Sequence, residues 1–189
     1  MQMLARMALS VFLVAALPSS VALGQTFTPS ATQSAELDAL FSRLSASTTE
    51  PEARQIADRI WRIWTRPDDP VLAARVDEII KGGGFAGPAS QLPLIDALIE
   101  DYPDYPEGWN LRATAHFMRG AYDDALADVA RTLALEPRHF GAMAGRALIL
   151  HTQGKYDQAL ESIKQALDIH PWLPERSLFP ELGKPPMRS

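Results

Sequence analysis

The sequence predicts an all-α fold, a solenoid of helical hairpins with about eight helices after a signal peptide. Two observations predict it: a 34-residue internal repeat in the second half of the chain, and apolar residues at helical spacing in the first half. When the sequence is shifted by 34 positions, nine of 34 residues coincide, against about two expected from typical residue usage. The coincident pairs are Arg112/Arg146, Ala113/Ala147, Gly120/Gly154, Tyr122/Tyr156, Asp123/Asp157, Ala125/Ala159, Leu126/Leu160, Leu133/Leu167 and Pro137/Pro171.

Composition narrows the class of protein. The chain has 189 residues, of which 47% are hydrophobic, which is enough apolar side chain for a sizeable core. It contains no cysteine, which excludes disulfides, thiolate metal sites, a cysteine nucleophile and a lipidated cysteine anchor. The formal net charge is −5 and no run of Lys or Arg interrupts the sequence, so we expect no nucleic-acid partner.

The first 24 residues have the order of a secretory signal peptide. Arg6 precedes an uncharged run over Met7–Leu17, and Ala22 and Gly24 supply the small residues that a cleavage site before Gln25 requires. The alternative is a retained membrane anchor, but the run is short for a bilayer core of about 30 Å. We therefore expect a periplasmic or secreted bacterial protein, without stable membrane insertion after cleavage.

Each repeat predicts one helical hairpin, and the shared residues have mechanical roles. Gly120 and Gly154 can end the first helix because glycine readily adopts the left-handed conformation. Asp123 and Asp157 suit the exposed N–H groups at the start of the second helix. The small Ala125 fits a close crossing of two helices. The predicted helices are Glu107–Arg119, Tyr122–Glu136, Gly141–Gln153 and Tyr156–Ile169.

These positions resemble the tetratricopeptide-repeat (TPR) family, which has Trp, Ala, Gly, Tyr, Ala, Ala and Pro at fixed offsets. The first repeat matches with Trp109, Ala113, Gly120, Tyr122, Ala125 and Pro137, and has Thr132 in place of the late alanine. The second matches with Ala147, Gly154, Tyr156, Ala159, Ala166 and Pro171, and has Met143 in the tryptophan place. The stretch around residues 106–143 is also similar to a group of small exported proteobacterial TPR proteins, and this resemblance defines no role for the chain.

The upstream half predicts two further hairpins. Val71–Lys81 and Ser90–Asp101 form a degenerate unit with a long connection, since Gly82–Gly84 stands about three residues before the family's turn. Ala35–Ser45 and Pro51–Thr65 form the first hairpin, with apolar residues at helical spacing. The predicted segments are 1–24 signal peptide, 25–33 flexible leader, 34–70 N-terminal hairpin, 71–105 degenerate TPR, 106–139 TPR, 140–173 TPR and 174–189 C-terminal tail.

The C-terminal end lacks the polar capping helix that terminal repeats usually need. Apolar residues continue instead through the proline-rich tail, among them Trp172, Leu178 and Phe179. Two interpretations stay open. The tail folds back over the last hairpin, or it is an exposed segment that docks a partner or a second copy of the chain.

No pattern of catalytic or cofactor chemistry stands out. The four histidines form no i, i+4 pair, and the Gly82–Gly84 run lacks the lysine of a phosphate loop. The acid pairs at Asp68 and Asp123 stand at helix starts, where capping explains them. We therefore expect no catalytic residue, no metal and no cofactor, and a protein that is not an enzyme.

The resemblance to TPR arrays places the first helix of each hairpin on a concave, peptide-binding face. The implied binding residues are Glu107, Asn110, Thr114, Phe117, Gly141, Ala144, Leu148 and His151. Their spacing puts each set on one helix face. The competing interpretation is that Phe117 and Leu148 belong to the core between repeats. The leading hypothesis is a scaffold or assembly factor of the cell envelope that binds a peptide segment of another protein. The alternative is a structural subunit that self-associates, as a homodimer for instance, through an uncapped C-terminal end.

Overall fold

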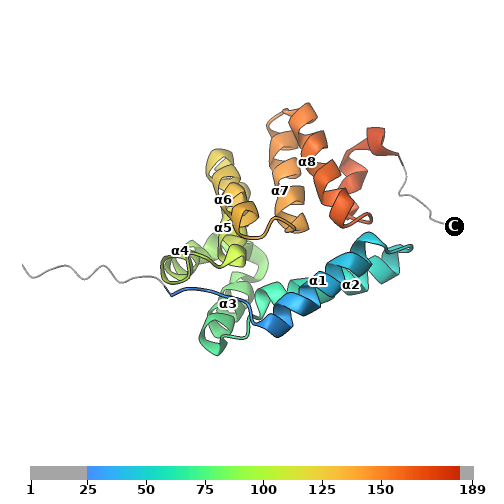
Figure 1. Ribbon diagram of the computed structural model, residues 1–189. Coiled ribbons are helices and arrows are strands. Elements are labelled where there is room, and N and C mark those ends of the chain that lie inside the picture. The colour runs from blue at the N-terminus through green and yellow to red at the C-terminus, as the bar shows by residue number, and fades with distance from the viewer. Residues whose placement is uncertain (1–24, 184–189) are drawn as a thin grey trace, which may run out of the picture.

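The computed structural model describes residues 25–183, except for the side chains of residues 84–86, and within that range every regular element is helical (Figure 1). This confirms the predicted fold class. The α-helices are α1 (Ala31–Ser45), α2 (Glu50–Thr65), α3 (Pro70–Gly83), α4 (Leu92–Asp101), α5 (Pro106–Met118), α6 (Tyr122–Leu135), α7 (Phe140–Thr152) and α8 (Tyr156–Ile169). Three 3₁₀ segments are η1 (Gly84–Gln91), η2 (Pro174–Leu178) and η3 (Pro180–Leu182). The predicted signal peptide lies outside the described residues. None of the described helices combines the length and apolarity needed to cross a membrane.

The two repeats form the hairpins α5–α6 and α7–α8, with bounds within one residue of those predicted. Gly120 and Gly154 both have φ of +73°, so each hairpin turn uses glycine in the left-handed region. Asp123 and Asp157 stand in the first turn of the following helix. The side chains of Ala125 and Ala159 are fully buried, as a close helix crossing requires.

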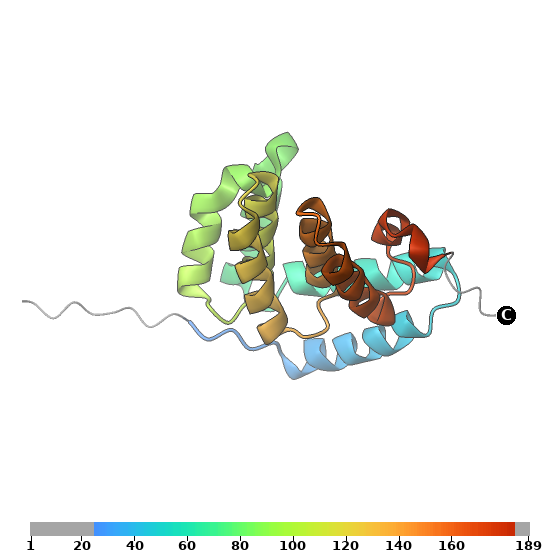
Figure 2. The ribbon, with the colours of Figure 1, turned by 90° about the horizontal axis from the view of Figure 1, so that it is seen from above.

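Three hairpins follow one another in space, α3–α4, α5–α6 and α7–α8 (Figures 1 and 2). The predicted long connection between α3 and α4 contains η1, where Gly87 has φ of +60°. A buried cluster that includes Leu72, Ile95 and Leu111 joins α3, α4 and α5. A second cluster, which includes Val129 and Ile149, joins α5, α6 and α7. The array therefore has a continuous core from one hairpin to the next.

The first hairpin does not continue this order. Helices α1 and α2 make little contact with α3 and instead run across the ends of the array, alongside α7 and α8 (Figure 2). The largest buried cluster joins residues of α1 and α2, such as Leu44 and Ile60, to Phe140 of α7 and Ile163 of α8. The N-terminal hairpin is thus a strap that connects the beginning of the described chain to its last repeat.

The C-terminal tail, in its described part up to residue 183, folds back over the last hairpin. Leu173 and Phe179 are buried in the same cluster as α7 and α8. The indole N–H of Trp172 donates to the carbonyl oxygen of Ser47, in the loop between α1 and α2, at 3.3 Å. Of the two interpretations that the sequence left open, the described part of the tail follows the first, and tail and strap together cover the outer surface that a polar capping helix would cover.

The segment predicted as a flexible leader makes contacts of its own. The backbone N–H of Gln25 donates to the carbonyl oxygen of Asp101 at 2.6 Å. The ring of Phe27 meets the buried ring of Tyr105 edge to face, with centroids 4.9 Å apart. Helix α1 then begins at Ala31, four residues before the predicted start, because Ser30 caps it by accepting from the N–H of Gln33.

Candidate functional site

A groove lies between α5 and α7 on the face that the first helices of the hairpins share. It encloses about 280 Å³. Five of the predicted peptide-binding residues line it, namely Asn110, Thr114 and Phe117 from α5 and Gly141 and Leu148 from α7. The structure therefore brings together residues from two repeats that the sequence could assign only to separate helix faces.

The walls of the groove are apolar and its polar groups come from one side. Ala113, Val129 and Ile149 are buried beneath it and belong to the core between the repeats. Along α5, Asn110 and Thr114 carry the polar atoms. Asn110 donates through Nδ2 to Glu107, and within residues 25–183 its Oδ1 receives no hydrogen bond. That oxygen can accept a hydrogen bond from a peptide N–H.

The sequence left open whether Phe117 and Leu148 belong to the peptide-binding face or to the core between the repeats. Phe117 is half-buried, packs against the core cluster and lies 5.9 Å from the ring of Tyr122, centroid to centroid. It also lines the groove, as does the half-buried Leu148. Phe117 therefore has one side in the core and one side toward the groove, whereas Leu148 lines the groove and belongs to none of the three buried clusters.

Glu107 is not a groove residue. Its side chain is buried, and its Oε2 lies 3.1 Å from Nε2 of the fully buried His139. His139 accepts the N–H of Ala142 through Nδ1 and thereby caps α7. Because Nδ1 is an acceptor, Nε2 carries the proton and donates to Glu107. This pair links the starts of α5 and α7 and is structural.

Ala144 and His151 are also covered. Ala144 is buried in the cluster beneath α2. The strap lies so close here that a Cβ added at the neighbouring Gly141 would stand 2.6 Å from the Trp61 ring. His151 packs between Tyr156 and Phe179 of the tail, with centroid distances of 5.1 and 5.6 Å. The strap and the tail occupy the parts of the α7 face where the family resemblance had implied a ligand.

Apart from the buried Ala113, Val129, Ala142 and Ile149, sequence analysis missed two residues that line the groove. Met118, which is exposed, lies at its lip, and Gly145 lies on its α7 wall. A Cβ added at Gly145 would meet nothing within 4 Å, so the groove is open there. Gly145 stands four positions before the groove-lining Ile149, so both lie on the same helix face. This spacing could have predicted Gly145 as a groove residue.

The described residues hold no group of three or more His, Asp or Glu side chains placed to bind a metal ion. Arrays of helical hairpins with a groove on their shared face form a class of binding proteins, and comparison with known sequences places this chain within it. The family model described as Tetratricopeptide repeat matches residues 92–134 and 122–172.

A TPR repeat-containing protein of Rhizobium etli is 34% identical over 135 residues. The aligned part covers 71% of this chain and 66% of the relative, so the chain spans just under two thirds of the relative's length. The chain belongs to the tetratricopeptide-repeat family through these repeats. Repeats of this family mediate protein–protein interactions.

Proposed function

We propose that this protein is a non-enzymatic adaptor of the bacterial cell envelope that binds an apolar peptide segment of another protein in the groove between α5 and α7. The observation that carries the proposal is the convergence of Asn110, Thr114, Phe117 and Leu148 on one groove of about 280 Å³. Export of the chain rests on the signal-like order of its first 24 residues.

The chemistry of the groove favours one kind of occupant. No residue that lines it is charged, so a charged side chain placed there would lose its hydration without gaining a partner. The amide of Asn110 and the hydroxyl of Thr114 can instead accept hydrogen bonds from a peptide backbone. A segment with small apolar side chains, held by its backbone along α5, satisfies both conditions.

Gly145 provides the sharpest test, because it allows the groove to be filled without disturbing the fold. A Cβ at position 145 would meet nothing within 4 Å, so a side chain can start there without a clash, and leucine favours a helix interior over glycine by about 1 kcal/mol or less. We expect this variant to fold with unchanged or raised stability and to lose its peptide partner. Phe117→Ala and Asn110→Ala should weaken the same interaction by removing a wall and an acceptor.

The measurement is quantitative mass spectrometry of proteins captured from envelope extract by the wild type and by each variant. Gln158→Leu, an equally apolar change at an exposed position of α8, is the matched control. We expect the same partner to be lost from Gly145→Leu and Phe117→Ala but kept by Gln158→Leu. Capture of nothing above background, or of the same proteins by all variants, would count against the proposal.

A further inference from the structure

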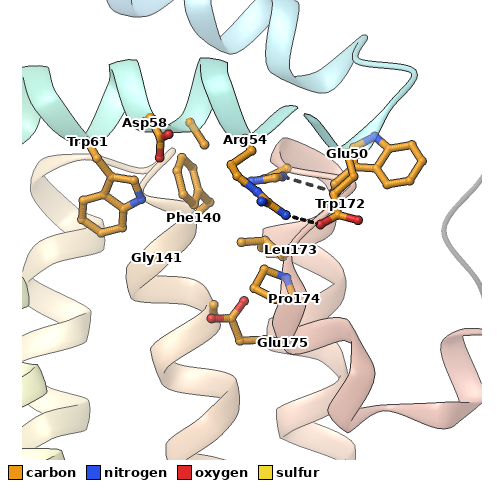
Figure 3. Close-up of a pocket in the computed structure, with 13 residues that line it drawn as sticks. Glu50, Arg54, Asp58, Trp61, Phe140, Gly141, Trp172, Leu173, Pro174 and Glu175 are labelled. Atoms are coloured by element: carbon orange, nitrogen blue, oxygen red, sulfur yellow. Dashed lines mark hydrogen bonds and ion pairs between the residues drawn. The ribbon is translucent and has the colours of Figure 1, made fainter. Parts of the chain in front are cut away.

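A second cavity lies on the other side of α7, where the strap, α7 and the tail meet (Figure 3). It encloses about 270 Å³, just below the roughly 300–1,000 Å³ of most small-ligand pockets. Trp61 of α2 and Phe140 of α7 form one wall, and Leu173 of the tail stands across from them. A ligand of this cavity therefore has to be small, and the part of it that lies between these side chains has to be apolar.

The charges around this cavity do not balance. Glu50, Asp58 and Glu175 line it with carboxylates, and Arg54 is the one cation among its lining residues. Arg54 is already paired with Glu50, at 2.5 Å. His170 adds no positive charge at neutral pH, because burial lowers its pKa to about 4. Two carboxylates therefore remain uncompensated.

Asp58 and Glu175 are these two carboxylates, and within residues 25–183 neither has a hydrogen bond or an ion pair. They stand on opposite sides of the cavity, Asp58 on α2 and Glu175 at the start of η2 (Figure 3). The Oε2 atom of Glu175 is buried and has no hydrogen-bond donor among the described residues. A carboxylate oxygen that is removed from water and left unpaired is costly, and a bound cation would relieve the cost.

We propose that this cavity binds a small aliphatic diamine. One ammonium group pairs with Glu175 and the other with Asp58, while the methylene chain lies along Trp61 and Phe140. Charge-assisted hydrogen bonds to the carboxylates supply orientation, and the aromatic faces favour a neighbouring cation as well as the apolar chain. The site is independent of the peptide groove, although Gly141 borders both.

Isothermal titration calorimetry of the purified protein with 1,5-diaminopentane at low ionic strength tests the site. We expect Glu175→Gln to weaken binding about tenfold or more, because it removes the partner with the buried oxygen. Asp58→Asn should weaken it about threefold, since Asp58 is exposed and water screens its charge. Arg54→Gln should strengthen binding, because it removes the positive charge beside the cavity and leaves Glu50 without its ion pair.

The controls separate this site from general attraction of an acidic protein for cations. Asp168→Asn removes a carboxylate from an exposed position of α8 and should leave the affinity unchanged, as should the groove variant Gly145→Leu. 1-Aminopentane, which has one ammonium group, should bind more weakly than the diamine. Binding that is absent, equal for the two amines, or unaffected by Glu175→Gln would overturn the proposal, provided that circular dichroism shows the variant folded.

Discussion

The two repeats share a backbone but differ in the electrostatics of one corresponding pair. In the first repeat Arg112 donates to both carboxylate oxygens of the buried Asp128, at 2.9 and 2.8 Å. In the second repeat Arg146 stands 34 positions on and donates to the hydroxyl of Ser162, at 2.8 Å. The hydrogen bonds to Asp128 raise the pKa of Arg112, whereas burial lowers the pKa of Arg146.

The difference follows from what surrounds each repeat. Arg112 also reaches Asp96 of α4 at 3.0 Å and lies over the ring of Trp109, so it connects the first repeat to the preceding hairpin. In the second repeat the position that corresponds to Asp96 is Ala130, which offers no carboxylate, and the other bond of Arg146 goes to Gln165 within its own repeat. The same position therefore acts as a connection between units in one repeat and as a local brace in the other.

Replacing each of the two arginines separately should give the largest difference in stability between the repeats. Arg112→Ala leaves the carboxylate of Asp128 buried without its main partner, so we expect a loss of about 3–5 kcal/mol in the free energy of unfolding. Arg146→Ala removes hydrogen bonds from a guanidinium to uncharged partners and leaves no buried charge behind, so it should cost about 1–2 kcal/mol. Urea unfolding of both variants measures the difference.

The double change Arg112→Ala with Asp128→Ser controls for the unpaired charge, since it removes the carboxylate and leaves serine as in the second repeat. It should be more stable than Arg112→Ala alone. Equal losses for the two single variants would mean that Asp128 contributes no more than Ser162 does.

Overpacking should affect the repeats equally. Ala125 and Ala159 are both fully buried where the two helices of a hairpin cross, and a leucine at either position should cost about 1–3 kcal/mol. Thermal unfolding of Ala125→Leu and Ala159→Leu measures both. An unchanged melting midpoint in either variant would contradict the close crossing in that hairpin, and unequal losses would show that one hairpin relaxes more readily.

The structure within each hairpin could be predicted from the sequence, because residues close together in the chain determine where its helices end, begin and cross. Gly120 ends a helix, Asp123 suits the next helix start and Ala125 allows the crossing, and all three recur after 34 residues. The position of the strap was not predictable in this way. Its contacts join Trp64 to His139, whose rings stack with centroids 4.0 Å apart, and Arg138 to Asp38, across 100 residues of chain.

The groove could be predicted in part for the same reason. Helical spacing placed Asn110, Thr114 and Phe117 on one face, and the structure keeps them together with Leu148. Spacing alone could not show that Trp61 covers the α7 surface beside Ala144, or that Phe179 covers His151. Both covering residues come from outside the repeats, so the 34-residue pattern could not predict their positions.

The smallest difference in stability that we expect between the two repeats concerns the C-cap residue of the second helix. In the first repeat this is Glu136, which is held by Arg138 at 3.1 Å, and in the second it is the buried His170. Burial lowers the pKa of His170 to about 4, below its ordinary value of 6.5. The unfolded chain therefore binds the proton more readily, and stability contributed by this histidine above pH 6.5 is lost as the pH falls toward 4.

We expect this loss to be about 1–2 kcal/mol between pH 7 and pH 5, after allowance for solvent screening. His170→Asn cannot take up a proton but keeps an acceptor for the N–H of Trp172, which His170 accepts through Nδ1 at 3.3 Å. Urea unfolding at both pH values should therefore show a smaller pH dependence in the variant than in the wild type. Equal slopes would mean that His170 is no less protonated in the folded protein than in the unfolded chain, and that the two repeats end in electrostatically equivalent ways.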